Sequence, residues 1–435
     1  MGSIKAVAVL ETFLPADALS VEGKAHVACR YCGSVGTRGT NYSRHPRMEE
    51  QLIDTVLTLP PAELEEGGAP MLVAVEATRL LREVRGIGRY VRALLPRLVA
   101  LRPGLRLTLF VKTQRDVEAV APVFAAMPAL RDHLEIRPVR EMVRSGADVF
   151  WYPWNTASPT PARGAVVATM HDIVPIAHPD PRLRGWQKNL RWRRRYGATA
   201  RRATLIIADS QFTADEIHRM LGVPRERMRV ALLAADDFAV PPAEGDVEVL
   251  ERLGVRKPFV LSVGAADRRK NLALLERAMP RVVAAHPGTT LVLAGPRRDA
   301  QPLLGDAAWR QTLGFVSDDE LAALYRAAGV LVMPSTYEGF GLPVLEAMRL
   351  GTPVICARGS SLPEVAGDAA MWVDGEDDAD LAAKVGRVLS DEHVSAAMRA
   401  ASLHQASRFS WDETARLTIA AFEEALEMAG TPKRR

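Results

Sequence analysis

Short, unbroken apolar runs recur along the chain from Met71 onward, separated by longer stretches with apolar residues at helical spacing. Strands of a parallel sheet are buried on both faces and have this appearance. The pattern predicts a first series of strands at 73–76, 105–111, 149–152, 166–170, 205–208 and 230–233. A second series is predicted at 259–263, 290–294, 313–316, 330–333, 354–356 and 371–373, after the proline-rich segment 241–245. Two successive strand–helix series predict an α/β protein with two doubly wound domains.

Helices are predicted between these strands, among them 88–101 and 213–221, and a last helix is predicted at 411–428. The sequence Thr213-x-x-Glu216 has the form of a capping box, which predicts that the second helix begins there. Ligands of doubly wound sheets bind outside the carboxyl ends of the strands. We therefore expect a ligand in the cleft between the two domains.

The first 70 residues do not follow this pattern, because small and polar residues occur in them without a sustained period. We interpret 1–70 as a poorly ordered extension and Met71 as a candidate for the true first residue. The extension contains four potential zinc ligands, His26, Cys29, Cys32 and His45. Their spacing matches no standard zinc finger, since no second histidine closely follows the last of them.

Composition excludes several classes of protein. The 435 residues contain no run of about 18 apolar residues, so no transmembrane helix is predicted. Three cysteines do not make a disulfide framework. The net charge is +4, so a basic surface for a partner has to be local. We expect a cytoplasmic enzyme that does not act on nucleic acid.

The most informative motif begins Glu338-Gly339-Phe340-Gly341-Leu342-Pro343 and ends at Glu346. Glycines let backbone N–H groups approach a ligand closely, and a proline suits the first turn of a helix. A helix N-terminus attracts anions, and two carboxylates accept hydrogen bonds from sugar or ribose hydroxyls. The motif therefore suits a sugar nucleotide, although a plain strand–turn–helix connection with two surface glutamates would show the same spacing.

With the segments around it, this motif resembles the C-terminal half of the retaining glycosyltransferases of family 4. The matching segments are 333–348, 351–355 and 362–365, and the resemblance extends over roughly 71–427. It implies the GT-B fold, with an acceptor domain at 71–245, a nucleotide-sugar domain at 246–408 and a segment at 409–435 that crosses back to the first domain. It also implies that Glu338 contacts hydroxyls of the donor sugar and that Glu346 binds the ribose. Donor contacts are expected as well from Gly339, Phe340, Gly341 and Leu342.

Cations follow the first strand of the second series, in Arg268-Arg269-Lys270-Asn271-Leu272. Cleavage of a sugar nucleotide leaves additional charge on the departing phosphate, so cations here stabilise the transition state more than the ground state. The family resembled here holds the diphosphate with an arginine and a lysine, and Arg269 and Lys270 match that pair better than Arg268. A solvated basic turn is the alternative.

A glycine-containing loop, Gly86-Ile87-Gly88, follows the first strand of the first series. Val91 stands where a dinucleotide fingerprint has its third glycine, which argues against an NAD site. The resemblance implies that Gly86 and Gly88 face the diphosphate and the acceptor. The alternative is a tight turn into a helix.

Two polar pairs follow predicted strands in the first domain. The resemblance implies that His171 contacts the donor sugar, and Asp172 could fix the tautomer of its ring. The second pair, Asp209 and Ser210, follows the strand predicted at 205–208. Helix capping accounts for Ser210 or for Thr213 after it, so we assign no catalytic role to this segment.

A basic segment spans 181–202 and holds nine cations without an acid: Arg182, Arg184, Lys188, Arg191, Arg193, Arg194, Arg195, Arg201 and Arg202. Trp186, Trp192 and Tyr196 are interleaved with them. Basic and aromatic residues on one helical segment suit an anionic membrane surface or a lipid-linked pyrophosphate acceptor. Binding of a single-stranded nucleic acid is the other interpretation, and a solvated arginine face over core aromatics is the structural one.

These motifs predict transfer of a sugar, with retention, from a nucleoside-diphosphate sugar to a hydroxyl of a glycan or lipid-linked acceptor, at the inner face of a membrane. The residues expected to carry the reaction are Glu338, His171, Lys270 and Arg269. GDP-mannose is the favoured donor, because the motifs resemble those of bacterial mannosyl- or rhamnosyltransferases of polysaccharide assembly. No Asp-x-Asp motif follows a strand near the cleft, so neither a metal nor a cofactor is expected. A sugar-nucleotide epimerase and a non-catalytic sugar-nucleotide-binding protein are the alternatives.

Overall fold

The computed structural model describes residues 70–83, 85–125, 127–179, 185–238, 245–264, 267–296 and 307–430. The predicted extension, up to residue 69, and the four potential zinc ligands in it lie outside this part. So do Arg182 and Arg184 of the basic segment and most of the predicted linker at 241–245.

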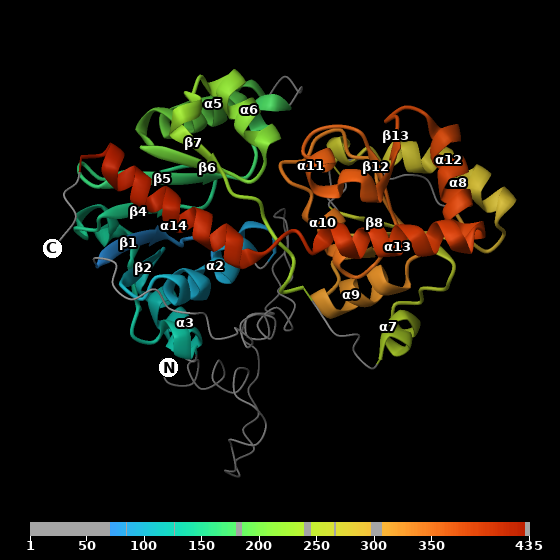
Figure 1. Ribbon diagram of the computed structural model, residues 1–435, viewed down its shortest axis with the longest axis horizontal. Helices are drawn as coiled ribbons and strands as arrows, with labels where there is room; N and C mark the ends of the chain where they lie inside the picture. The colour runs from blue at the N-terminus through green and yellow to red at the C-terminus, as the bar shows by residue number, and fades with distance from the viewer. Residues whose placement is uncertain are drawn as a thin grey trace, which may run out of the picture.

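The described chain forms two lobes side by side, each built on a parallel sheet (Figure 1). In the first lobe the order is β3-β2-β1-β4-β5-β6-β7, and in the second it is β10-β9-β8-β11-β12-β13. The first sheet comprises β1 Met71–Glu76, β2 Leu105–Val111, β3 Leu134–Pro138, β4 Val149–Tyr152, β5 Ala165–Met170, β6 Leu205–Ala208 and β7 Met228–Val230. The second comprises β8 Phe259–Val263, β9 Thr290–Ala294, β10 Arg310–Gly314, β11 Val330–Met333, β12 Val354–Ala357 and β13 Ala370–Val373. The α/β fold predicted from the apolar runs is confirmed.

Helices cover both faces of each sheet, as expected for strands that are apolar on both sides. Those of the first lobe are α2 Ile87–Leu101, α3 Gln114–Ala125, α4 Val174–Ala177, α5 Trp186–Arg202 and α6 Gln211–Leu221. The second series contains α7 Asp246–Arg252, α8 Leu272–Ala285, α9 Asp318–Ala327, α10 Leu342–Arg349, α11 Leu362–Ala366, α12 Asp378–Ser390 and α13 Glu392–Ala406. Short 3-10 turns lie at Pro128–Leu130, Val139–Arg144, Arg225–Arg227, Arg268–Lys270 and Gly367–Ala369. Among the described helices, none is both long and apolar enough to span a bilayer.

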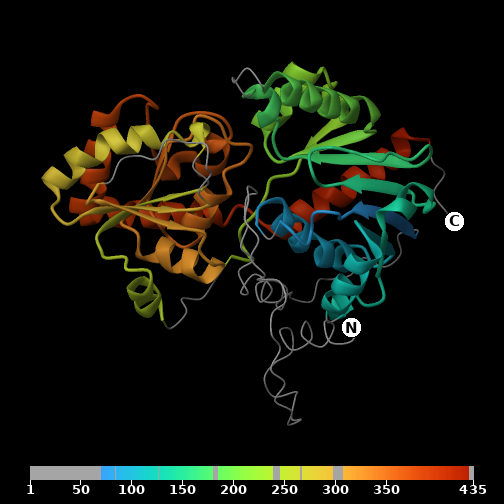
Figure 2. The ribbon, with the colours of Figure 1, turned by 180° about the vertical axis from the view of Figure 1, so that it is seen from behind.

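The last helix, α14 (Trp411–Met428), returns to the first lobe and packs beside α2. Views from both sides place α14 on the face of the first sheet opposite α5 and α6 (Figures 1 and 2). The predicted crossing of the C-terminal helix is therefore confirmed, with the predicted bounds.

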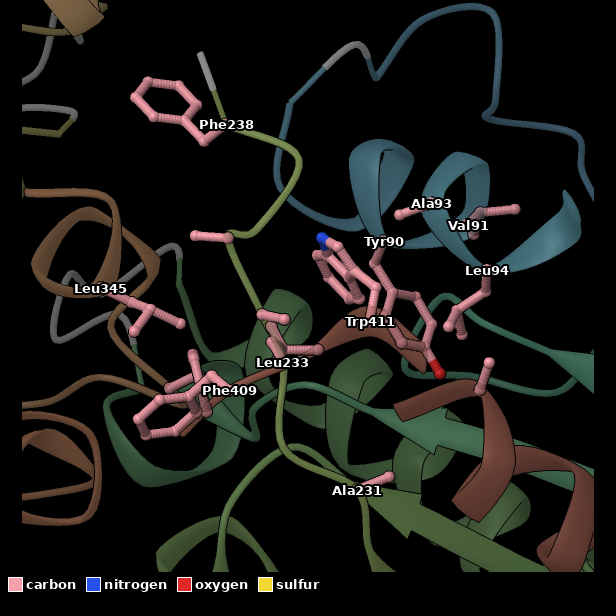
Figure 3. Packing of buried hydrophobic residues seen from close by; sticks show 14 of the residues in the cluster. Tyr90, Val91, Ala93, Leu94, Ala231, Leu233, Phe238, Leu345, Phe409 and Trp411 are labelled. Carbon is pink, nitrogen blue, oxygen red and sulfur yellow. The ribbon is translucent and has the colours of Figure 1, made fainter. Parts of the chain in front are cut away.

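Apolar side chains from both lobes form one continuous cluster at the junction (Figure 3). Trp411 is fully buried, and its ring centroid lies 6.1 Å from that of Tyr90 on α2. Two residues earlier, Phe409 packs against Phe340 of the second lobe, with centroids 6.1 Å apart. The chain thus crosses between the lobes inside a shared core.

Candidate active site

The loop after β11 leads into α10 and contains the three residues Gly339, Phe340 and Gly341. Gly341 is the N-cap of α10, and its backbone angle φ is +107°. Residues with a Cβ rarely adopt this value, so the turn requires glycine. The Phe340 ring is buried against Phe409, and Leu342 is partly buried against the same cluster. A ligand at this loop would therefore meet the backbone of Phe340 and Leu342 rather than their side chains.

Gly339 is the point where this loop meets the first lobe. A Cβ at Gly339 would lie 2.0 Å from the carbonyl oxygen of His171. The Gly339 carbonyl accepts hydrogen bonds from Ser210 Oγ at 2.7 Å and from Thr213 Oγ1 at 2.9 Å. The donor-side loop is thus fastened to the carboxyl edge of the first sheet, and the close approach requires glycine.

Ser210 is the N-cap of α6, and its Oγ accepts a hydrogen bond from the Thr213 backbone N–H at 3.0 Å. The prediction that the helix starts at the Thr213 capping box was wrong, because α6 begins at Gln211 and Thr213 lies inside its first turn. Capping explains Ser210, as predicted, yet both hydroxyls also link the lobes. Glu364 of α11 adds a second link, since its carboxylate accepts the N–H groups of Gln211 and Phe212 at 2.7 Å each.

Lys270 and Glu338, both predicted site residues, form an ion pair. Lys270 Nζ lies 2.7 Å from Glu338 Oε1, and the two side chains are 13% and 12% exposed. The Glu338 backbone N–H donates to Ser360 Oγ at 3.1 Å, which helps to hold this position. The structure therefore joins the predicted diphosphate cation to the predicted sugar contact, 68 residues apart in sequence.

Arg269 lies beside this pair but turns toward the backbone. Its Nη1 donates to the Tyr337 carbonyl at 3.2 Å, and its own carbonyl accepts the Thr336 N–H at 2.7 Å. Its Nε is 3.4 Å from a carboxylate oxygen of Asp267, yet buried without a hydrogen bond to any described atom. Arg269 is thus held beside the Lys270–Glu338 pair by Asp267 and by the Tyr337 carbonyl.

Glu346 is buried, and both of its carboxylate oxygens have protein partners. Oε1 accepts from Arg89 Nη1 at 2.7 Å, and Oε2 accepts from the Tyr325 hydroxyl at 3.1 Å. Burial raises the pKa of Glu346, and the Arg89 guanidinium opposes that rise. Each oxygen has a second lone pair, so the carboxylate can still accept a ribose hydroxyl.

Arg89 comes from α2 of the first lobe, so its bond to Glu346 crosses the cleft. It also donates to both oxygens of Asp237. Four residues earlier, Arg85 crosses as well, with its Nε 2.8 Å from Asp318 Oδ1 of the second lobe. Neither arginine was predicted to have a role, although both lie in the motif around Gly86 and Gly88.

The two glycines of that motif have different environments. Gly86 has φ +58° and open space where a Cβ would be, so a ligand can approach it. A Cβ at Gly88 would lie 1.5 Å from the Glu83 carbonyl oxygen. Packing of the turn therefore explains Gly88 without a ligand, which is the alternative left open by the sequence.

His171 is buried at the end of β5, and both of its ring nitrogens are occupied. Nδ1 lies 2.6 Å from Asp209 Oδ2, and Nε2 lies 2.9 Å from the Pro153 carbonyl. The proposal that Asp172 fixes the ring was wrong, because the Asp172 carboxylate accepts the Val174 N–H instead. Burial would lower the pKa of His171, but the Asp209 carboxylate outweighs it and raises that pKa. Both ring nitrogens are thus engaged by neighbouring groups, and the part of His171 that faces Gly339 is its carbonyl.

The sequence carried a clue to the Asp209 pairing. Asp209 directly follows β6, as His171 follows β5, and these strands are neighbours in the sheet. Polar residues at the ends of adjacent parallel strands meet at the same edge. No comparable local rule would identify Arg89 or Tyr325, because their shared partner, Glu346, does not follow a neighbouring strand.

Known proteins match the chain in both halves. Residues 251–405 match the model of the glycosyl transferases group 1, and residues 84–237 match that of glycosyltransferase family 4. The O-antigen chain mannosyltransferase B of Escherichia coli is 34% identical over 272 residues, which cover 59% of this chain and 70% of that protein. The serotype-specific mannosyltransferase WbdA of Escherichia coli is 30% identical over 63% of this chain, but the match spans 34% of its own length.

The arrangement of the lobes also has solved counterparts. The Anabaena protein HepE, in complex with UDP and glucose, superposes with a TM-score of 0.60 at 18% identity, covering 81% of this chain and 100% of that one. At this identity the likeness concerns the fold, which is the two-lobed GT-B arrangement expected from the sequence.

Proposed function

Because the chain belongs to the glycosyltransferases of family 4, we propose that it transfers mannose from GDP-mannose to an acceptor hydroxyl, with retention of configuration. That it is a glycosyltransferase follows from the family. The choice of mannose is supported by the relative that shares 34% identity and is named a mannosyltransferase. The observation that carries the proposal is the Lys270–Glu338 ion pair at the loop that opens α10.

Lys270 supplies a point charge for the diphosphate, and Arg269 adds a second positive charge beside it. These cations stabilise the charge that grows on the departing phosphate. When a diphosphate engages Lys270, the Glu338 carboxylate becomes available to the hydroxyls of the donor sugar. Glu346 accepts the ribose hydroxyls through its remaining lone pairs, and its bond to Arg89 connects donor binding to the first lobe.

The loop residues complete the donor site. Gly339 and Gly341 bring the backbone close to the ligand, and Phe340 and Leu342 take part through their backbones. On the facing lobe, Gly86 leaves open space for the diphosphate, with Gly88 shaping the turn. His171 takes part indirectly, because its main-chain carbonyl packs against Gly339 of the donor loop and its ring holds the strand end through Asp209.

The acceptor is a glycan or a lipid-linked glycan in polysaccharide assembly, and the enzyme meets an anionic membrane surface through α5. Support comes from Lys188, Arg191 and Arg193, which are exposed on this helix. We also propose that the reaction needs no metal or cofactor, since Lys270 and Arg269 supply the positive charge. Turnover unchanged by EDTA would agree with this, and turnover restored only by a divalent ion would contradict it.

The decisive experiment offers the purified protein a panel of GDP-, UDP- and dTDP-sugars, each with and without a membrane lipid extract. Release of GDP from GDP-mannose, faster with the extract, is the expected result. Proton NMR of the mannosylated product should show the same anomeric configuration as the donor. Isomerised donor without free nucleoside diphosphate would instead identify an epimerase, and a bound but unchanged donor would identify a binding protein.

A further inference from the structure

A cavity of about 380 Å³ opens in the first lobe, away from Lys270 and Glu338. Its walls come from the carboxyl end of β1, the segment after β4, and one side of α5. The lining residues used below are Glu76, Arg79, Trp154, Arg194, Arg195 and Arg202. A volume of this size is within the usual range of small-molecule sites.

Four arginines converge on this cavity. Arg194 and Arg202 are eight residues apart on α5, with Ala198 midway, so all three lie on one side of the helix, next to Arg195. Within the described part of the chain, no carboxylate forms an ion pair with Arg194, Arg195 or Arg202. Arg79 has a loose partner, Glu83, at 3.9 Å. An anion bound in the cavity would be attracted by all four charges.

Glu76 is the one acid that lines the cavity, and it is buried at the end of β1. Burial raises the pKa of Glu76, which opposes a fixed negative charge near the arginines. One of its oxygens accepts the Thr78 N–H at 3.0 Å, and the Glu76 carbonyl accepts the Trp154 indole N–H at 2.7 Å. A carboxyl group held in this way can exchange hydrogen bonds with sugar hydroxyls.

We propose that this cavity binds a phosphate ester of the acceptor: the arginines hold the phosphate, and Glu76 contacts the hydroxyls of the sugar attached to it. The proposal rests on the glycosyl transfer proposed above and names the chemical class of its acceptor. A guanidinium group binds two phosphate oxygens at once in a forked geometry, whereas a lysine offers a single point charge. Arginines around the cavity therefore suit a phosphate group. The acceptor is thus a sugar phosphate or a glycan carried on a phosphate-linked lipid.

The test compares two compounds that differ by the phosphate, octyl mannosyl phosphate and octyl mannoside. Binding is measured by isothermal titration calorimetry in the presence of saturating GDP, so the result does not depend on turnover. We expect the phosphate to bind at least about tenfold more tightly to the wild-type protein. Equal binding of the two compounds would overturn the proposal.

Two double variants separate the cavity from general charge. Arg194→Gln with Arg195→Gln should abolish the phosphate preference. Arg191→Gln with Arg193→Gln removes the same charge from the same helix at positions that do not line the cavity, and should keep it. An equal loss in both variants would show a general effect of charge and contradict the proposal.

Two more arms separate this site from the donor site and identify the source of the phosphate. The Lys270→Ala variant should still bind octyl mannosyl phosphate more tightly than octyl mannoside, because Lys270 is not part of the cavity. Loss of this phosphate preference in the variant would overturn the proposal. If mannose 1-phosphate binds as tightly as the octyl compound, the site takes a free sugar phosphate. Weaker binding would support a phosphate carried on a lipid chain. Absence of glycosyl transfer would defeat the proposed function and leave this binding result standing.

Discussion

The proposed donor side and the proposed acceptor side of this molecule differ in how their charges are balanced. On the donor side, Lys270 is paired with Glu338 and Arg89 with Glu346 and Asp237, all of them largely buried. Around the acceptor-side cavity, Arg194 and Arg195 are exposed and have no acidic partner in the described part of the chain.

The difference has a physical cause. A buried charge without a partner is costly, so the donor site can be preformed only if its own carboxylates balance its cations. Exposed arginines are stabilised by water and can wait for an anion. The charged groups of the proposed donor site therefore also help to hold the two lobes together, whereas those around the proposed acceptor cavity can change with little effect on folding. The predictions below test this contrast, from the largest expected effect to the smallest.

Arg89→Met should break the contrast most directly, because it leaves Glu346 and Asp237 buried without their cation. We expect a loss of about 3–5 kcal/mol in the free energy of unfolding, measured by urea denaturation. Adding Glu346→Gln should recover part of the loss, since one uncompensated charge is removed. The matched control is Arg195→Met, for which we expect a change within about 0.5 kcal/mol. Similar losses for the two arginines would refute the contrast.

Lys270→Ala tests the donor side through catalysis. It removes charge stabilisation from the transition state, so kcat should fall by about 10²-fold or more. Lys384, which pairs with Asp380 on α12 outside the site, provides the control, and Lys384→Ala should leave kcat unchanged. Near-wild-type turnover of Lys270→Ala would reject the assignment of the diphosphate cation.

The buried His171–Asp209 pair should make stability depend on pH. The folded-state pKa of His171 is raised, so its contribution is fully present below the unfolded pKa of about 6.5 and is lost as pH rises through the folded value. The difference in unfolding free energy between wild type and His171→Gln should therefore be largest near about pH 6 and decrease toward about pH 9. Each unit by which the pKa is raised corresponds to about 1.4 kcal/mol. A difference that does not vary with pH would mean that the ring is neutral when folded.

The smallest effect is expected for the exposed arginines of α5. Arg191→Gln with Arg193→Gln should weaken binding to vesicles containing anionic lipid by about 1 kcal/mol for each charge removed. The loss should diminish as salt is added, because screening already weakens the wild-type interaction. Sedimentation with vesicles at low and high salt measures it. If binding to the vesicles at low salt is unchanged, these arginines form a solvated face and do not contact a membrane.

Most of the strands that the sequence predicted well are inner ones, although the edge strand β13 was also predicted to within one residue. The runs at β2, β4, β6, β8, β9 and β11 agree with the structure residue for residue. The mistakes are at sheet edges: β3 was not predicted, β7 and β10 were displaced, and all three are edge strands. An edge strand is partly exposed and need not be a continuous apolar run, as Arg310-Gln311-Thr312 in β10 shows. Patterning therefore identifies buried strands, and among edge strands it found only β13, whose run is apolar.

The candidate site divides in a similar way. Glu338, Lys270 and Glu346 could be found because each belongs to a motif that is contiguous in sequence. The Arg89–Glu346 bond joins residues 257 positions apart, on different lobes, and no local spacing encodes it. The partner of His171 was misjudged for a related reason, since the adjacent Asp172 was chosen over Asp209 on the neighbouring strand. Residue types and motifs thus identify the groups of a site, while their pairing depends on topology.

The shared core at the junction determines how parts of this enzyme could be exchanged with those of a relative. Phe409 packs on Phe340 of the second lobe, while Trp411 packs on Tyr90 and donates its indole N–H to Asp237 at 2.7 Å. Ser410 lies between two residues that belong to different lobes. A chimera that takes a new donor lobe should therefore include Phe409 in the transplant and keep Trp411–Met428 from the recipient. A seam placed at either end of α13 would separate one aromatic anchor from the surface it evolved to fit.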